Sequence, residues 1–122
     1  MVVAKFTTDE KRYMVSLHVK GHAGANNPGN DIVCASASIL AYTLAQNIKI
    51  AETRKRLKYS PTLKLKEGDA IITCRAKDKE AYEELCFTYC LTQTGYQLLA
   101  HNYPQYVAVE MFGEDTNVLN NK

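Results

Sequence analysis

Two long segments with helical spacing separate pairs of short strand-like segments, and this order constrains the fold more than any other feature. The helical segments span residues 31–56 and 77–101, and in both of them apolar side chains recur every three or four positions. The strand-like segments are residues 2–8, 13–20, 62–66, 70–75 and 106–112. The order β-β-α-β-β-α-β predicts an α/β two-layer sandwich, a mixed sheet of about five strands with both helices on one face.

The same spacing predicts which side chains the helices bury. For the first helix we expect Ile32, Ile39, Leu40, Leu44 and Ile48 in the core. For the second we expect Tyr82, Leu85, Cys86, Tyr89, Leu98 and Leu99. Asp31 is the expected N-cap of the first helix, and Pro61 predicts that the strand after it lies at a sheet edge or begins there.

The composition is that of one ordinary globular domain, which we expect to span residues 1–122. Of the 122 residues, 46% are hydrophobic and 23% are charged, which argues against a disordered, low-complexity or fibrous chain. The formal net charge is +2, too small to indicate nucleic acid as the main partner.

The cysteines argue against a metal or redox cofactor. Cys34, Cys74, Cys86 and Cys90 form no CxxC pair, so a thioredoxin-like site and the common zinc-finger spacings are disfavoured, and we expect no cofactor. A metal site from Cys86, Cys90 and His101 is disfavoured too, because the histidine lies too far along the helix. The N-terminal residues contain no apolar signal segment, and residues 32–48 are too polar for a membrane span. We therefore expect a cytoplasmic protein with reduced thiols.

One segment carries the residues of a chemical site. Residues 21–30 form a glycine-rich loop between a strand and a helix, with His22 at its beginning. If Asp31 caps the helix, Cys34 is its third residue, where unpaired N–H groups and the helix dipole favour the thiolate. A histidine twelve residues earlier can fold back across the loop and act as the base of a cysteine nucleophile. A cysteine alone is more often a small buried apolar residue, the reading we give Cys74, Cys86 and Cys90, so the residues alone leave the His22–Cys34 pair open.

The segment also resembles a known family. Gly-His-Ala-Gly at 21–24, Gly-x-Asp-Ile-Val-Cys-Ala at 29–35 with Ser38, and Tyr-Pro-Gln-Tyr-Val at 103–107 resemble the ribosomal-processing cysteine protease (Prp) family over nearly the whole chain. The resemblance implies a cytoplasmic, dimeric cysteine endopeptidase without a metal. Such enzymes remove the N-terminal extension of a large-subunit ribosomal protein and cut after a pair of phenylalanines.

The resemblance also implies roles for individual residues. The family's histidine corresponds to His22, its nucleophile to Cys34, and its aspartate and serine to Asp31 and Ser38. The charge of Asp31 would disfavour the thiolate, whereas orienting the imidazolium of His22 would favour it. The loop with Gly21, Gly24 and Gly29 is the expected gate over the substrate. Residues 25–28 lack the aromatic residue expected near position 25, and Ser36 stands where alanine is commoner.

Two other functions and one assembly state remain open from the sequence. A non-enzymatic ribosome- or RNA-associated module would use a basic stretch, namely Arg54, Lys55, Arg56, Lys58, Lys64 and Lys66. A thiol-based redox sensor would use Cys34, although no resolving cysteine lies nearby in the sequence. Helices on one sheet face leave the other face uncovered, so we expect that face to be buried in a homodimer.

Overall fold

A computed structural model describes residues 1–24 and 30–113 of the chain. The element order is the one the sequence predicts, β-β-α-β-β-α-β. The elements are β1 (Val2–Asp9), β2 (Met14–Lys20), α1 (Asn30–Thr53), β3 (Thr62–Lys66), β4 (Asp69–Arg75), α2 (Lys79–Asn102) and β5 (Val107–Gly113).

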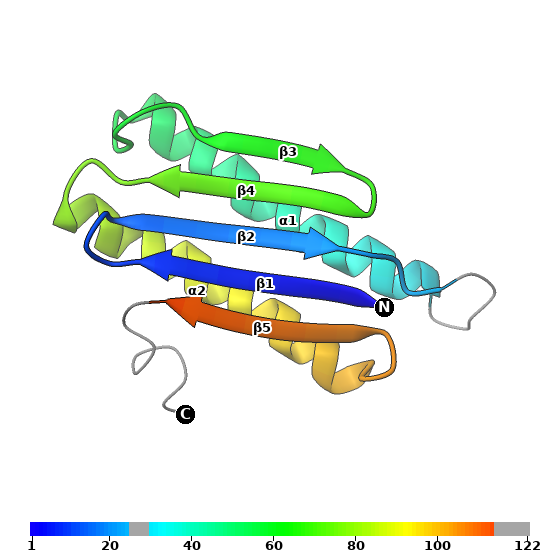
Figure 1. The fold of residues 1–122 in the computed structure, drawn as a ribbon. Coiled ribbons are helices and arrows are strands. Elements are labelled where there is room, and N and C mark those ends of the chain that lie inside the picture. Colours follow the sequence, from blue (N-terminus) through cyan, green and yellow to red (C-terminus); the bar gives the residue numbers. More distant parts are fainter. Residues whose placement is uncertain (25–29, 114–122) are drawn as a thin grey trace.

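The five strands form one mixed sheet in the order β3-β4-β2-β1-β5. All neighbours are antiparallel except β1 and β5, which run parallel with Val2 beside Val107. Both helices lie on the same side of this sheet (Figure 1), so the predicted two-layer arrangement is confirmed. β3 is an edge strand, as Pro61 predicts.

Local backbone features explain where the helices differ from their predicted bounds. α2 begins at Lys79 because the side chain of Asp78 caps it, accepting a hydrogen bond from the amide of Ala81 at 2.9 Å. α1 ends at Thr53, three residues before the predicted end, because Lys55 adopts a left-handed conformation with φ of 59°. The amide of Arg56 then bonds to the carbonyl of Ala51, which closes the helix end.

The core lies between the sheet and the two helices. Phe6 at its centre has no exposed surface, and its ring meets Tyr89 and Tyr96 edge to face at 5.4 and 5.7 Å between centroids. Facing β2, β3 and β4, α1 presents mostly small or β-branched side chains: Val33, Ala37, Ala41, Leu44, Ala45 and Ile48. Small residues let α1 approach the sheet closely, which seats the beginning of that helix against the end of β2.

Three predicted core residues are wrong. Ile32 and Ile39 on α1 and Leu98 on α2 are 55%, 60% and 58% exposed. On α1, Val33 and Ala37 face the sheet, and a helical face centred on them turns Ile32 and Ile39 outward. The sequence pattern followed the largest apolar residues, whereas the fold buries the smaller ones.

The uncovered sheet face is largely polar, contrary to the apolar face expected to bury a partner. The hydroxyls of Ser16 and Thr73 hydrogen-bond across β2 and β4 at 2.9 Å, and His18 Nε2 lies 2.7 Å from Asp69 Oδ1. The most exposed large apolar side chains stand instead on the outer surface of the helices, notably Ile39, Phe87 and Leu91. Within residues 1–24 and 30–113, no helix is long and apolar enough to cross a membrane.

Candidate active site

A cavity of about 290 Å³ lies between the end of β2, the beginning of α1 and the turn between β3 and β4. These three segments meet at one end of the sheet (Figure 1). His22 and Cys34, twelve positions apart in the sequence, both line this cavity. The two residues that the sequence analysis considers as a pair therefore line one cavity.

His22 is placed by a turn directly after β2. Gly21 has a φ of 102°, a conformation that favours glycine, and its amide donates to the carbonyl of Gly68 at 2.9 Å. The amino group of Met1 donates to the carbonyl of His22 at 2.6 Å. These backbone bonds fix the main chain of His22, while its side chain remains exposed and reaches the cavity.

Cys34 lies in the second turn of α1 and is half-buried. The helix begins at Asn30, so Asp31 lies in its first turn and Cys34 is the fifth helical residue. The prediction that Asp31 is the N-cap and Cys34 the third residue is wrong, because the helix starts earlier than Asp31. The amide of Cys34 is then available to the carbonyl four residues earlier, and the unpaired N–H groups belong to the preceding turn.

The remaining predicted site residues fall into different groups. Ser38 lies one turn after Cys34 and also lines the cavity, as does Gly21. Asp31 is exposed and is not among the residues that line the cavity. Gly24, with a φ of 103°, lies outside the cavity lining, and Gly29 lies outside the described residues.

Sequence reasoning missed the third wall of the cavity, formed by Lys66, Glu67, Gly68 and Asp69. The turn at 67–69 is recognisable in the sequence, but its place beside His22 is not. That place depends on β4 pairing with β2, in which Lys20 lies opposite Asp69. Tyr42 on α1, which also lines the cavity, was missed because it lies two turns beyond Cys34.

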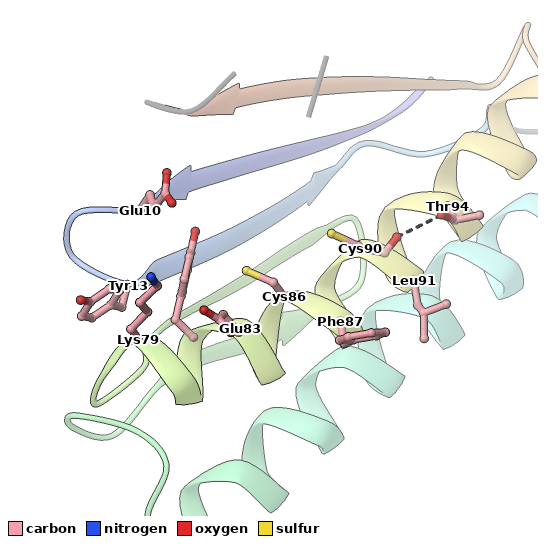
Figure 2. Close-up of a pocket in the computed structure, with 10 residues that line it drawn as sticks. Glu10, Tyr13, Lys79, Glu83, Cys86, Phe87, Cys90, Leu91 and Thr94 are labelled. Atoms are coloured by element: carbon pink, nitrogen blue, oxygen red, sulfur yellow. Dashed lines mark hydrogen bonds between the residues drawn. The ribbon is translucent and has the colours of Figure 1, made fainter. Parts of the chain in front are cut away.

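A second and larger cavity, of about 690 Å³, lies between the β1–β2 turn and α2. Figure 2 shows Cys86 and Cys90 on α2 at its wall, with Glu10 and Tyr13 at the β1–β2 turn. Cys90 is exposed, so its expected burial is wrong, and Cys86 is half-buried, with burial raising the pKa of its thiol. Tyr13 and Tyr82 line this cavity rather than the one beside Cys34.

Other candidate chemistry is not assembled in the described part of the chain. Cys74 is buried, as expected, and burial raises its pKa to about 12. No group of three or more histidine, cysteine, aspartate or glutamate side chains is arranged to hold a metal ion among the described residues. In the basic stretch considered for RNA, Arg56 is engaged with Glu84, with its Nη2 2.7 Å from Oε1.

Comparison with solved structures shows the same fold. A Streptococcus mutans protein, SMU.848, matches with a TM-score of 0.65 and 23% identity over 93% of this chain and 96% of its own. An S. aureus protein described as an essential ribosomal processing protease Prp, solved with a substrate peptide, matches with a TM-score of 0.67 and 18% identity. That match covers 91% of this chain and 99% of the other. The same S. aureus protease with a covalently linked product peptide gives 0.63 and 19% over the same shares.

Sequence comparison identifies the family. No curated protein matches the chain. The family model described as cysteine protease Prp matches residues 1–108, which include the two cavity-lining residues His22 and Cys34 and the strands and helices that place them. The chain therefore belongs to the cysteine protease Prp family.

Proposed function

We propose that this chain is a cysteine endopeptidase in which Cys34 is the nucleophile and His22 the general acid and base. The observation that carries the proposal is the shared cavity, which both side chains line from separate elements. Membership of a cysteine protease family supports it.

The proposed reaction is acyl transfer. Cys34 Sγ attacks the carbonyl carbon of the scissile bond as a thiolate, and His22 gives a proton to the leaving amine as the C–N bond breaks. A water molecule, deprotonated by His22, then attacks the thioester and releases the acid product and the thiol. Amides of the first turn of α1, those of Asp31 and Ile32 among them, have no acceptor within the helix and would stabilise the oxyanion.

The other predicted site residues have supporting roles in this proposal. Ser38, which lines the same cavity one turn after Cys34, would contact the sulfur or the bound peptide. Asp31, exposed in the first turn, acts on the site through its charge. That the loop with Gly21, Gly24 and Gly29 closes over the bound peptide stays a prediction, since residues 25–29 lie outside the described part of the chain.

We propose that the substrate is the N-terminal extension of a large-subunit ribosomal protein, cut after aromatic residues. The S. aureus protein with the same fold is described as a ribosomal processing protease. In this chain the cavity wall includes apolar residues, Val2, Ala37, Ala41 and Tyr42, which can receive an aromatic side chain. Processing of a ribosomal protein would place the enzyme in the cytoplasm.

The test is cleavage of a peptide with two phenylalanines before the cut and a small residue after it. We expect a single cut, and its loss in both Cys34→Ala and His22→Ala, whereas Cys90→Ala, at the other cavity, retains wild-type activity. Replacing both phenylalanines with alanine should lower kcat/KM by at least about a hundredfold, because each buried ring contributes about 1.5–3 kcal/mol. Cleavage by Cys34→Ala above a tenth of the wild-type rate contradicts the nucleophile assignment, and scattered cuts contradict the substrate.

We further propose that the chain forms a homodimer through the outer face of the helices rather than through the sheet. Phe87 and Leu91 are 78% and 69% exposed, and with Leu98 they form one outward stripe on α2. Isolated exposed apolar residues are common, but a stripe of this kind is typical of an interface. Light scattering should give a dimer for the wild type and for Thr7→Glu on the sheet face, and a monomer for Leu91→Glu. A monomeric wild type at micromolar concentration contradicts the proposal.

A further inference from the structure

We propose that Gly68, in the turn between β3 and β4, is a positioning residue that holds the imidazole of His22 at the Cys34 cavity. The inference rests on the proposed function for the role of His22 as the catalytic base. Gly68 lies 34 positions beyond Cys34 in the chain, in the β3–β4 hairpin. It belongs neither to α1 nor to the glycine-rich loop.

The contact between Gly68 and the His22 ring is direct. A Cβ atom added at Gly68 would overlap His22 Nε2 and lie 2.6 Å from Cε1, closer than any real Cβ contact. The imidazole therefore occupies the space that a side chain at position 68 would fill. Any other amino acid at this position must move either the ring or the turn.

The turn itself is held against β2, so the ring is the part free to move. The carbonyl of Gly68 accepts the amide of Gly21 at 2.9 Å, directly beside His22 in the chain. The next residue, Asp69, contacts His18 on β2 at 2.7 Å. Gly68 has a φ of 77°, a left-handed conformation that glycine adopts without strain. The hairpin is thus held to β2 and to the residue after it at Gly68 and Asp69, where it meets the ring.

Displacement of the ring matters because proton transfer needs close geometry. A general base works within about 2.6–3.2 Å of the proton-bearing atom, and a displacement of about 1 Å can lower a rate about a hundredfold. Gly68 has no side chain and exchanges no proton, so it acts on the reaction only through the position of the imidazole. Its effect should therefore be seen in kcat and in the reactivity of Cys34, and less in substrate binding.

The test is Gly68→Ala, with Lys64→Gly as the matched control. Lys64→Gly weakens the same hairpin through β3 without adding an atom beside His22. We expect Gly68→Ala to lower kcat at least tenfold with KM within about twofold, and Lys64→Gly to keep the wild-type kcat. If Gly68→Ala does not fold, Gly68→Asn serves instead, since asparagine tolerates a left-handed backbone and still carries a Cβ.

A second readout separates positioning from a general loss of structure. The rate at which iodoacetamide alkylates Cys34, followed by mass spectrometry of its peptide across pH, should shift to higher pH in Gly68→Ala as it does in His22→Ala. In the His22→Ala background, adding Gly68→Ala should change this profile no further, because the ring is already absent. The inference is overturned if Gly68→Ala shifts the alkylation profile of the His22→Ala variant as far as it shifts that of the wild type. A wild-type kcat in Gly68→Ala overturns it as well.

The outcomes also distinguish this inference from the proposed function. Wild-type cleavage by His22→Ala would remove the role of His22 and the proposed function with it. Loss of cleavage in His22→Ala together with full activity in Gly68→Ala would leave the protease proposal standing and overturn only the role of Gly68.

Discussion

Tyr96 joins the two helices next to the candidate active site, and its hydroxyl allows a quantitative test of the packing. It has no exposed surface, and its hydroxyl donates to the carbonyl of Ala37, one turn after Cys34, at 2.5 Å. Burial raises the pKa of this hydroxyl, so it stays protonated and remains a donor throughout the working pH range. The variant Tyr96→Phe removes this donor and leaves the ring in place.

The expected loss of stability in Tyr96→Phe depends on whether the carbonyl of Ala37 keeps another hydrogen bond. The carbonyl of Ala37 lies inside α1 and retains its place in the helix hydrogen-bond pattern, so no bare acceptor is left. The cost is then that of one hydrogen bond, about 1 kcal/mol, rather than the roughly 3 kcal/mol of an unsatisfied buried group. With an unfolding entropy of about 2.1 cal/mol/K per residue, 122 residues give a decrease in Tm of about 4 °C.

The assay is thermal and urea unfolding of the wild type, Tyr96→Phe and the control Tyr59→Phe. Tyr59 is 52% exposed, so loss of its hydroxyl should change the free energy of unfolding by less than about 0.5 kcal/mol. Equal stability of the two variants would refute the assigned hydrogen bond. A loss above about 3 kcal/mol would refute the reasoning that the Ala37 carbonyl stays satisfied.

Two further predictions concern charge and thiol chemistry. His18 holds the pKa of Asp69 below its ordinary value of 3.8, so the pair stabilises the fold above that value and the contribution is lost as pH falls through the lowered pKa. Urea unfolding should therefore show Asp69→Asn less stable than the wild type near pH 6 and equally stable near pH 2. A difference in the free energy of unfolding that persists at pH 2 contradicts the pairing. Burial raises the pKa of Cys74 to about 12, so Cys74 should resist iodoacetamide in the folded protein while the exposed Cys90 reacts. Mass spectrometry measures both rates, and modification of Cys74 at the rate of Cys90 would contradict its burial.

The sequence predicts the secondary structure well because its signals are local. The alternation of Val15, Leu17 and Val19 with polar residues defines β2, and Pro61 marks β3 as an edge strand. The helix faces were harder to predict. On α1, Ile32 and Ile39 are exposed while Ala37 and Ala41 are buried, since close approach to the sheet favours small side chains.

The part of the site that could be predicted is the part formed by residues close together in the sequence. His22 and Cys34 flank one loop, and the family motif marks both. Gly68 reaches the same cavity through the pairing of β4 with β2, which joins positions about fifty residues apart. No local pattern encodes that pairing, so the contact between Gly68 and His22 becomes visible only in the folded chain.

The parallel pairing of the first and last strands has a consequence for synthesis of the protein. β1 lies between β2 and β5, so its second edge stays open until residues 107–113 have been made. At about 5–20 residues per second, translation of the roughly hundred intervening residues takes about 5–20 s. During that time β1, with its apolar segment Val2-Val3-Ala4 and Phe6, presents one unpaired edge. A ribosome that stalls before β5 is made therefore leaves a nascent chain whose exposed strand edge can pair with other chains, and chaperones would bind such an edge.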